Sequence, residues 1–275
     1  MKKMKIAGLL LLSLFIVTKS LAQSGSAEQL TVPLTNPGKP YTLKAQLVQG
    51  SIKVVSYDGK DIIINVTPKE AEEEGDSNAT ENGMKRISAS GGYEHTAKEA
   101  DNTITVNAGN PNKALNLDLK IPQDVKLKLG TVNNGSIEVE NVRGELEVNN
   151  VNDEIKLINI SGSVVANTVN GDVTVTFNMV DPKAPMAFST LNGDVRVTLP
   201  ADTKANLKMK SDMGDVFSDF DIAIDKTPPK VDKTSEPGMY KIKKDDWVYG
   251  KINGGGPEMI MKNMHGNIYV KKAVK

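Results

Sequence analysis

Apolar and polar residues alternate along residues 134–177 in a pattern that repeats about every nine positions. The successive units read GSIEVENVR, GELEVNNVN, DEIKLINIS, GSVVANTVN and GDVTVTF. In each complete unit the third, fifth and eighth positions are apolar, as are Ile137, Val139 and Val142 in the first unit. The third and fifth positions are typical of a strand with one buried face, and the eighth predicts a buried corner. The repeat therefore predicts stacked β structure.

Units two apart resemble each other more closely than adjacent units do. The turn motifs that begin at Asn134, Asn152 and Asn170 recur at equal intervals of two units, which predicts two unlike strands in each coil. Related motifs at 191–195, 213–216 and 265–268 continue the pattern after insertions. We therefore predict an all-β solenoid, similar to a parallel β-helix, with about 18–22 residues per coil. In such a stack Asn134, Asn152, Asn170 and Asn192 are expected to form a ladder of hydrogen-bonded amides.

An antiparallel β-sandwich or meander is the alternative, because Asn-Gly between alternating strands is also a strong hairpin signal. The apolar residue at the eighth position of the repeat argues against an antiparallel arrangement. Val142, Val151, Ile160 and Val169 would lie at exposed hairpin tips, whereas a solenoid corner would bury them. Since each such side chain contributes about 1.5–3 kcal/mol when it is fully buried, the pattern favours the solenoid over the meander.

The chain divides into three predicted segments. Residues 1–22 combine a basic start, a short apolar core and the small-residue site Ser20-Leu21-Ala22, which is typical of a secretory signal peptide. Residues 23–40 are polar and rich in Ser, Pro and Gly, and they predict a flexible tether. Residues 41–275 are expected to form a single repetitive β domain, with irregular loops at 68–101 and 225–245.

The composition narrows the possible partners. The chain has 34 basic and 34 acidic residues, so it carries no electrostatic signature for nucleic acid or for anionic lipid. No segment after the signal is apolar enough to predict a membrane span. Because the sequence contains no cysteine, neither a disulfide nor a lipid-modified cysteine is available after export.

The sequence offers no convincing catalytic or metal-binding motif. His95 and His265 have no partner at a spacing that would predict a zinc site or a catalytic triad. One Asp per corner supplies too few oxygens for calcium, and Asn, Asp and Gly favour such turns without a ligand. We therefore expect no catalytic residue, no metal and no cofactor. The corner carboxylates considered as calcium ligands are Asp172, Asp194, Asp212 and Asp215.

Aromatic residues, which make up 4% of the chain, gather near the C-terminal loop. Tyr240, Trp247 and Tyr249 lie in or beside it, and Tyr269 follows further on. Such side chains are candidates for ligand binding, because recognition residues often lie on loops. The alternative, which we favour, is a cap that covers the last apolar coil of the stack, because uncovered solenoid ends invite aggregation.

Several segments together resemble a known family. The stretch VQGSIKVVSYDGKDIIINV, the segment IPQDVKLKL and the serial N-G-D-V and N-G-S-I motifs are similar to the DUF4097 family, whose members are described as adhesins. The resemblance covers roughly residues 43–177. It implies an extracytoplasmic, β-solenoid-like domain of a bacterial envelope, and some members resemble parts of envelope-stress systems. The family provides no catalytic motif that could be transferred to this chain.

The expected function is therefore that of a non-catalytic, adhesin-like module, either secreted to the cell surface or retained in the periplasm. Its partner would be a protein or a glycan of the cell envelope. Two alternatives stay open at this point. One is an envelope-stress sensor with a specific protein partner, and the other is a solenoid that binds or cleaves a polysaccharide.

Overall fold

The computed structural model describes residues 28–69, 80–81, 84–85, 94–108, 113–225, 231–236, 239–244 and 246–274. The regular structure in these ranges consists of β-strands. The predicted signal peptide, residues 1–22, lies outside them. Among the described residues, none belongs to a helix long and apolar enough to cross a membrane.

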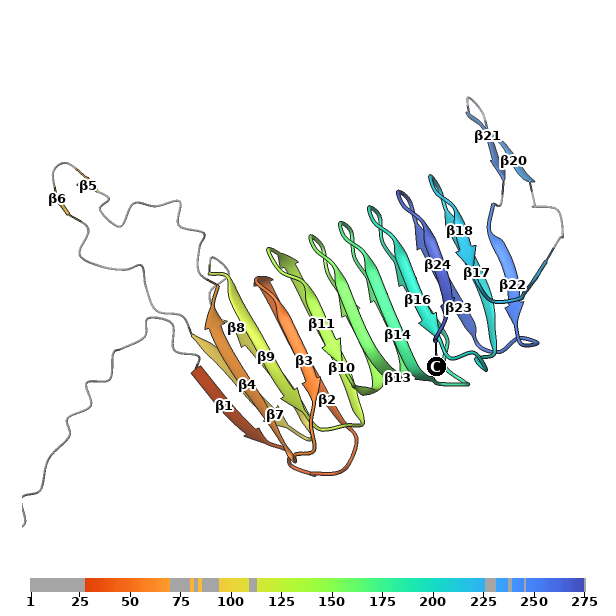
Figure 1. Cartoon of the computed structure of the whole chain (residues 1–275). Helices are drawn as coiled ribbons and strands as arrows, with labels where there is room; N and C mark the ends of the chain where they lie inside the picture. The colour runs from red at the N-terminus through yellow and green to blue at the C-terminus, as the bar shows by residue number, and fades with distance from the viewer. Residues whose placement is uncertain are drawn as a thin grey trace, which may run out of the picture.

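One continuous 20-stranded sheet winds into a flattened solenoid with two facing layers, which we call the first and the second sheet (Figure 1). The first sheet has the spatial order β1 (Glu28–Pro33), β4 (Asp61–Pro68), β9 (Leu115–Ile121), β3 (Ile52–Ser56), β11 (Ile137–Glu140), β13 (Ile155–Asn167), β14 (Val173–Val180), β16 (Val195–Leu199), β24 (Ile268–Lys272), β18 (Val216–Ser218).

The second sheet runs beside the first and shares β13 with it. Its spatial order is β7 (His95–Ala100), β8 (Thr103–Ala108), β2 (Tyr41–Gln49), β10 (Val125–Asn133), β12 (Arg143–Asn149), β13, β15 (Met186–Ser189), β23 (Glu258–Asn263), β17 (Ala205–Ser211), β22 (Val248–Ile252), β19 (Ile222–Ile224). Two separate hairpins pair β5 (Thr80–Glu81) with β6 (Met84–Lys85) and β20 (Val231–Glu236) with β21 (Met239–Lys244).

The coil length agrees with the sequence repeat. Ile155 lies beside Val173, which begins the next coil, and Val173 in turn lies beside Val195. Both pairings are parallel, which confirms the predicted β-solenoid over the antiparallel meander. Within each strand alternate residues point inward, so the same apolar positions of successive coils stack on one another in the core.

The coils at the two ends of the chain are threaded into the stack out of sequence order. The β2–β3 coil, which comes first in the chain, lies between the β8–β9 coil and the β10–β11 coil. The β23–β24 coil, which comes last, lies between the β15–β16 coil and the β17–β18 coil. Repeats that share one motif therefore do not stack in the order in which they occur along the chain.

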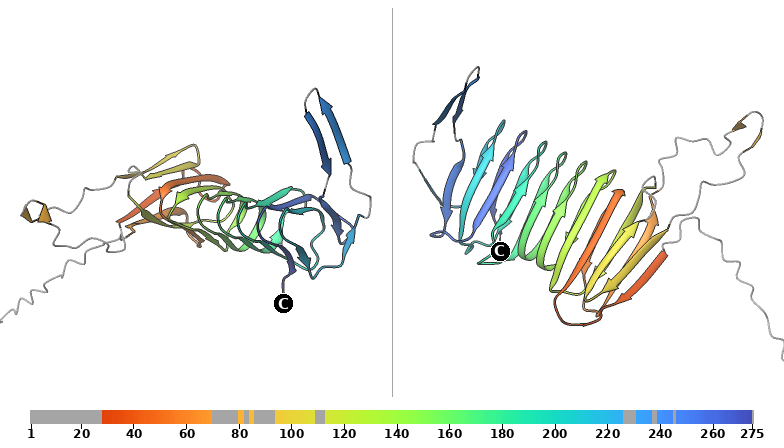
Figure 2. Two further views of the ribbon diagram at one scale, coloured as in Figure 1. Left: turned by 90° about the horizontal axis from the view of Figure 1, so that it is seen from above. Right: turned by 180° about the vertical axis from the view of Figure 1, so that it is seen from behind.

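Antiparallel strands cover the ends of the stack. At one end β4 pairs antiparallel with β9, and β7 pairs antiparallel with β8 (Figure 2). At the other end β22 pairs antiparallel with β17. Such strands interrupt the parallel register, which otherwise offers a free edge to further copies.

Three segments that the sequence predicts to be irregular contain strands. The predicted tether, 23–40, includes β1, because the alternating residues Leu30 and Val32 pack against the core and Leu34 is buried. The predicted loop 68–101 includes β7, whose Ala97 packs against the core from a polar sequence. The predicted loop 225–245 contains the β20–β21 hairpin.

The two corners of each coil differ in burial. Val142 and Ile160 are buried as predicted, because Asn141 and Asn159 adopt left-handed backbone conformations that turn the next side chain inward. Val169, in contrast, is exposed and Val151 is half-buried, so the prediction of a buried corner is wrong for alternate repeats. The exposed corners form a continuous edge of the solenoid.

Candidate functional site

Each coil crosses from the second sheet to the first through a turn with a repeated sequence pattern. The first turn residue points inward and is polar in five consecutive coils. Its side chain donates a hydrogen bond to a backbone carbonyl of the preceding coil in space, which fixes the turn at a buried position. These bonds join Thr131 to Gly50 (2.9 Å), Asn150 to Gly135 (3.1 Å), Thr168 to Asp153 (3.0 Å), Thr190 to Gly171 (2.8 Å) and Asn263 to Gly193 (3.1 Å).

The next residue of each turn is apolar and faces solvent. In spatial order these residues are Val48, Val132, Val151, Val169, Leu191 and Met264. Val151 is half-buried, and the side chains of the other five are between 38% and 46% exposed. We call this row the apolar ridge. Its members come from the whole length of the chain, and the two threaded coils supply the residues at its ends.

Backbone hydrogen bonds hold the apolar ridge in register. The carbonyl of Val132 accepts the amide of Asn152 (3.1 Å), and the carbonyl of Val151 accepts the amide of Asn170 (2.8 Å). The carbonyl of Leu191 likewise accepts the amide of His265 (2.9 Å), which belongs to the threaded β23–β24 coil. Since neighbouring strands lie about 4.8 Å apart, the six residues span about 24 Å.

A ladder of asparagine side chains runs along one flank of the apolar ridge. The amide of Asn192 donates to Asn170 (2.7 Å), that of Asn170 to Asn152 (2.8 Å), and that of Asn152 to Asn133 (2.8 Å). Asn134, which the sequence analysis placed in this ladder, does not join it. In the register of β10 with β12, Leu127 lies beside Leu146. The offset between these paired residues is one residue longer than the spacing of the turn motifs. Asn133, and not Asn134, therefore lies opposite Asn152.

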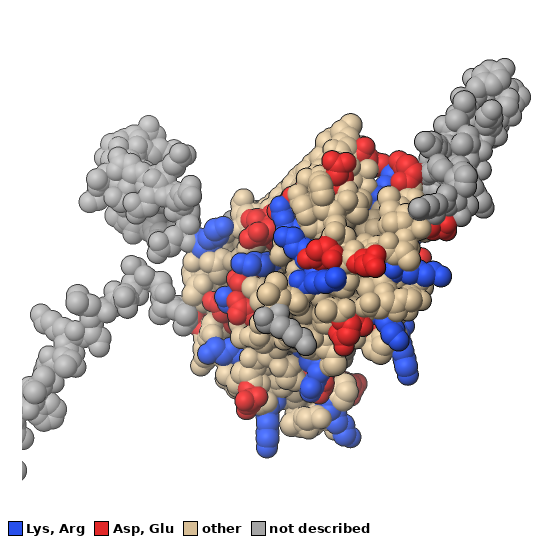
Figure 3. Space-filling view, turned by 45° about the vertical axis from the view of Figure 1, so that its right-hand side comes forward, with Lys and Arg blue, Asp and Glu red and all other residues tan. Residues whose placement is uncertain are grey.

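The two rows beside the apolar ridge carry no formal charge over five coils. On the side of the ladder these residues are Gln49, Asn133, Asn152, Asn170 and Asn192. On the other side they are Gln46, Gly130, Asn149, Asn167 and Ser189. Charges of both signs occur instead on the two faces, where Lys53 lies 3.3 Å from Glu138 and Lys126 lies 3.0 Å from Glu145. Basic and acidic side chains are similarly intermingled on the surface in Figure 3.

The ridge is hollowed near the N-terminal end of the stack. Here Val48, Val132 and Val151 line a shallow pocket of about 450 Å³, together with Gln46 and Asn149 of the uncharged row. The pocket is therefore bordered by aliphatic side chains and amides, and it contains no ionisable group. Such a lining suits a neutral ligand that offers apolar surface and hydrogen-bonding groups.

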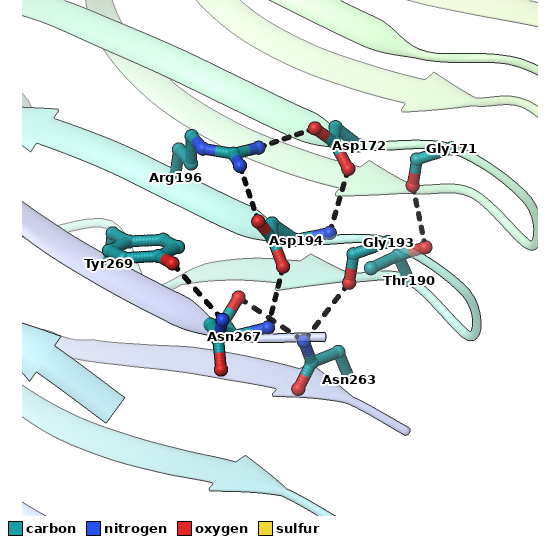
Figure 4. A network of polar contacts seen from close by, with 9 residues as sticks. All are labelled: Gly171, Asp172, Thr190, Gly193, Asp194, Arg196, Asn263, Asn267 and Tyr269. Atoms are coloured by element: carbon teal, nitrogen blue, oxygen red, sulfur yellow. Dashed lines mark hydrogen bonds and ion pairs between the residues drawn. The ribbon is translucent and has the colours of Figure 1, made fainter. Parts of the chain in front are cut away.

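A charged cluster lies at the start of strands of the first sheet (Figure 4). The guanidinium of Arg196 binds the carboxylates of both Asp172 and Asp194. Asp194 also accepts the backbone amide of Asn267 (2.6 Å), whose side chain donates to the hydroxyl of Tyr269 (3.1 Å). The cluster joins the turns of three coils, one of which is threaded in from the C-terminus.

Tyr269 extends this cluster toward the end of the stack. Its ring stacks on that of Phe217 with centroids 5.3 Å apart, and the Arg196 guanidinium lies 5.3 Å from its centroid. Both carboxylates of the cluster are therefore held by a fixed cation beside stacked rings. Within the described part of the chain, no group of three or more His, Asp or Glu side chains could hold a metal ion.

The aromatic residues singled out from the sequence lie at the C-terminal end. Trp247 is half-buried, and the Lys208 ammonium lies 4.8 Å from its ring centroid. Tyr249 is exposed on β22, directly opposite Lys208 of β17. The side chain of Tyr240, on β21, lies outside the described residues. Trp247 and Tyr249 thus share one end of the second sheet, away from Tyr269 on the first sheet.

The apolar ridge was not identified from the sequence. Its residues Val151 and Val169 occupy the same repeat position as the buried Val142 and Ile160. A usable signal was present, because each ridge residue is followed by Asn, Gln or His and preceded by a small polar residue or Leu. The buried corners Val142 and Ile160 are followed by Arg143 and Ser161 instead.

Comparison with known proteins gives one family match. The family model of Toastrack DUF4097 matches residues 118–270. A solved structure of a proposed cell adhesion protein from Clostridium sporogenes shares 12% identity and covers 91% of this chain and 100% of that chain, with a TM-score of 0.44. A proposed adhesin from Bacteroides fragilis shares 7% identity and covers 92% of this chain and 98% of that chain, with a TM-score of 0.31. No curated protein matches.

Proposed function

The chain belongs to the Toastrack DUF4097 family, and on this basis we propose that it is a non-catalytic module of the cell envelope that binds its partner through the apolar ridge. The observation that carries the proposal is the row of exposed aliphatic side chains in register over six coils. Singly exposed apolar residues are ordinary on protein surfaces, whereas a contiguous row marks an interaction site. The partner is a neutral glycan or an uncharged protein surface, because the flanking rows carry no charge over five of the six coils and only Lys262 continues one row at the sixth.

The proposed location is outside the cytoplasm. Residues 1–22 have the features of a secretory signal peptide. After cleavage the module would be periplasmic or would reach the cell surface.

The electrostatics of the lysines support a non-catalytic role over a polysaccharide lyase. A lysine that acts as a general base requires a lowered pKa. Hydrogen bonds to Glu140 and Glu138 instead raise the pKa of Lys53, and a hydrogen bond to Glu147 raises that of Lys128. Hydrogen bonds to Asp246 and Asp212 raise the pKa of Lys210 in the same way. These lysines therefore stay protonated at neutral pH and serve as ion-pair partners.

Binding to immobilised probes tests the proposal. Mature protein would be applied to a glycan array, to purified peptidoglycan sacculi and to phospholipid vesicles, and release of soluble saccharide would be measured in parallel. We expect saturable binding to a glycan or to sacculi without release of product. Substitution of Val169→Glu together with Leu191→Glu is expected to weaken this binding at least tenfold, because it places two charges on the ridge, and a tenfold loss is about 1.4 kcal/mol.

Matched variants separate the ridge from the rest of the surface. Thr174→Glu with Thr198→Glu adds the same charge to the outer row of the first sheet and should leave binding unchanged. Trp247→Ala with Tyr249→Ala tests the aromatic residues and should also leave it unchanged. If either control lost binding while the ridge variant bound fully, the binding site would lie at the control residues and not on the ridge. Release of saccharide by the wild type would refute a non-catalytic role.

A further inference from the structure

Hydrogen-bonded side chains line both sides of the apolar ridge. On one side runs the asparagine ladder. On the other side the amide of Asn167 donates to Asn149 (3.2 Å), and the hydroxyl of Ser189 donates to Asn167 (2.7 Å). This second ladder links three neighbouring coils, in the row that Gly130 and Gln46 continue toward the N-terminal end of the stack. The apolar ridge therefore lies between two polar rows that hold hydrogen-bonded ladders.

The two ladders leave hydrogen-bonding capacity for a ligand. A carboxamide has two N–H donors and an oxygen that accepts two bonds. Asn170 donates one bond and accepts one within its ladder, and Asn167 does the same on the other side of the ridge. Each of these side chains therefore keeps one donor and one acceptor. Because the bonds along the ladders already fix both amides, a ligand that binds them has few further side chains to order.

The spacing of the ridge disfavours an extended peptide as its occupant. Neighbouring coils lie about 4.8 Å apart, whereas the side chains on one face of a peptide strand recur about every 6.6–6.8 Å, which is twice the rise per residue. The backbone amides of Asn152, Asn170, Asn192 and His265 are already bonded to carbonyls of the neighbouring coil. A peptide strand along the ridge would therefore find neither a matching register of side chains nor these amides available.

A flat chain of sugar rings matches the same geometry. In a β-1,4-linked chain of equatorially substituted pyranoses, the ring faces present C–H groups and the ring edges carry hydroxyls. Each sugar residue is about as long as the distance between neighbouring strands. Laid lengthwise, such a chain places one ring over each ridge residue and its hydroxyls beside both ladders. Sites for neutral ligands combine apolar contact with a few placed polar groups in the same way.

The hollow at Gly130 provides room for a substituent of the sugar. Because Gly130 has no side chain, the second row is interrupted there, and this gap belongs to the pocket of about 450 Å³. Gln46 and Asn149 flank the gap on the two adjacent coils, and Val132 also lines the pocket. An acetamido group matches this lining, because its N–H and carbonyl can bond to the amides while its methyl group packs on the valine.

Building on the proposed binding role of the ridge, we propose that its ligand is a linear β-1,4-linked chain of N-acetylated hexosamines, bound lengthwise with one sugar ring on each coil. The chain covers the ridge from Val48 to Met264, and one acetamido group lies in the hollow at Gly130. Affinity then rises with the number of sugars, because each further ring buries another apolar side chain of the ridge.

Calorimetric titration with defined oligosaccharides tests this ligand class. Affinity for N-acetylglucosamine oligomers should rise at least tenfold from the trimer to the hexamer, and maltohexaose, whose α-1,4 linkages curve the chain, should not bind. In the variant with Val169→Glu and Leu191→Glu, the hexamer should bind no more tightly than the trimer binds the wild type. In this variant only Val48, Val132 and Val151 remain as a contiguous apolar row. Equal affinities of trimer and hexamer, or of the hexamer and maltohexaose, would overturn the proposal.

Filling the hollow tests the acetamido group separately. The wild type should bind the N-acetylglucosamine hexamer at least tenfold more tightly than cellohexaose, which lacks acetamido groups, and Gly130→Gln should remove this preference. A Cβ atom at Gly130 would meet its nearest neighbour at 3.6 Å, so the variant is expected to fold. Lys44→Gln introduces the same side chain outside the pocket lining and should keep the preference. A wild type without this preference, or a Gly130→Gln variant that retains it, would contradict an acetamido site in the hollow.

Failure of this ligand class is distinguishable from failure of the ridge as a binding surface. The protein could bind a different glycan or a protein probe and lose that binding in the variant with Val169→Glu and Leu191→Glu. With no binding of N-acetylglucosamine oligomers, this result would refute the ligand class and leave the proposed function standing. Binding of every probe by this variant at the level of the wild type would refute both.

Discussion

At the scale of the residue, the turns of the solenoid are built from side chains that bond from one coil to the next. The asparagine ladder could be predicted from the sequence at Asn152, Asn170 and Asn192, because these residues occur at near-coil spacing. Asn134 could not be distinguished from Asn133, because the choice depends on a single-position difference in strand offset. Burial of Val142 and exposure of Val169 likewise depend on the local backbone of two different turns.

The ladder predicts a measurable loss of stability. Asn170→Ala removes the bond donated to Asn152 and the bond accepted from Asn192, and it should lower the free energy of unfolding by about 1 kcal/mol in urea titrations. Thr174→Ala, on the outer row of the same coil, should change it by less than about 0.5 kcal/mol. Equal effects of the two substitutions would show that the ladder adds nothing to stability.

The ion pair between Asp124 and Arg143 predicts a pH dependence. The Arg143 guanidinium, 2.6 Å from the carboxylate, lowers the pKa of Asp124 below its ordinary value of 3.8. Because the pKa is depressed in the folded state, the stabilisation is present above the ordinary value and is lost as the pH falls through the lowered one. Asp124→Asn should therefore reduce the melting temperature at neutral pH.

The same comparison at low pH provides the check. As the pH falls through the lowered pKa and Asp124 becomes protonated, the melting temperatures of the wild type and Asp124→Asn should converge. Asn tolerates the left-handed backbone of Asp124, with φ of 63°, so the substitution changes charge without adding strain. A difference that stays constant from neutral to acidic pH would contradict a contribution from this pair.

At the scale of the element, glycines allow adjacent coils to approach closely. Gly162 has a φ of 136°, and a Cβ atom at this position would lie 2.0 Å from the carbonyl oxygen of Gly144 on the neighbouring strand. The repeat placed glycine at this position in the sequence, but the short contact between strands could be known only from the register of β12 with β13.

Gly162→Ala should therefore lower the free energy of unfolding by more than about 2 kcal/mol, since both the backbone conformation and the contact become unfavourable. Gly130→Ala is the matched control, because its Cβ would meet its nearest neighbour, Cγ of Gln46, at 3.6 Å without a left-handed backbone. The control should change stability by less than about 0.5 kcal/mol. Chemical denaturation of both variants measures the difference, and similar losses would indicate that close approach is not the cause.

At the scale of the whole molecule, threading of both end coils shapes the solenoid and completes the apolar ridge. The solenoid and its coil length could be predicted because they depend on a local repeat. The order of the coils could not be predicted, because every coil carries the same motif. The motif therefore does not specify which coils become neighbours. Val48 and Met264 reach the ends of the ridge through this order alone.

Disulfide formation between ridge positions tests the threaded order most directly. Leu191 and Met264 are distant in the chain but lie on adjacent coils, as the hydrogen bond between His265 and Leu191 shows. Leu191 and Asp212, which holds the corresponding position in the β17–β18 coil, are much closer in the chain but are separated by the threaded coil, which puts them beyond the reach of a disulfide. We predict rapid oxidation of Leu191→Cys with Met264→Cys and none of Leu191→Cys with Asp212→Cys, and the reverse result would contradict the account.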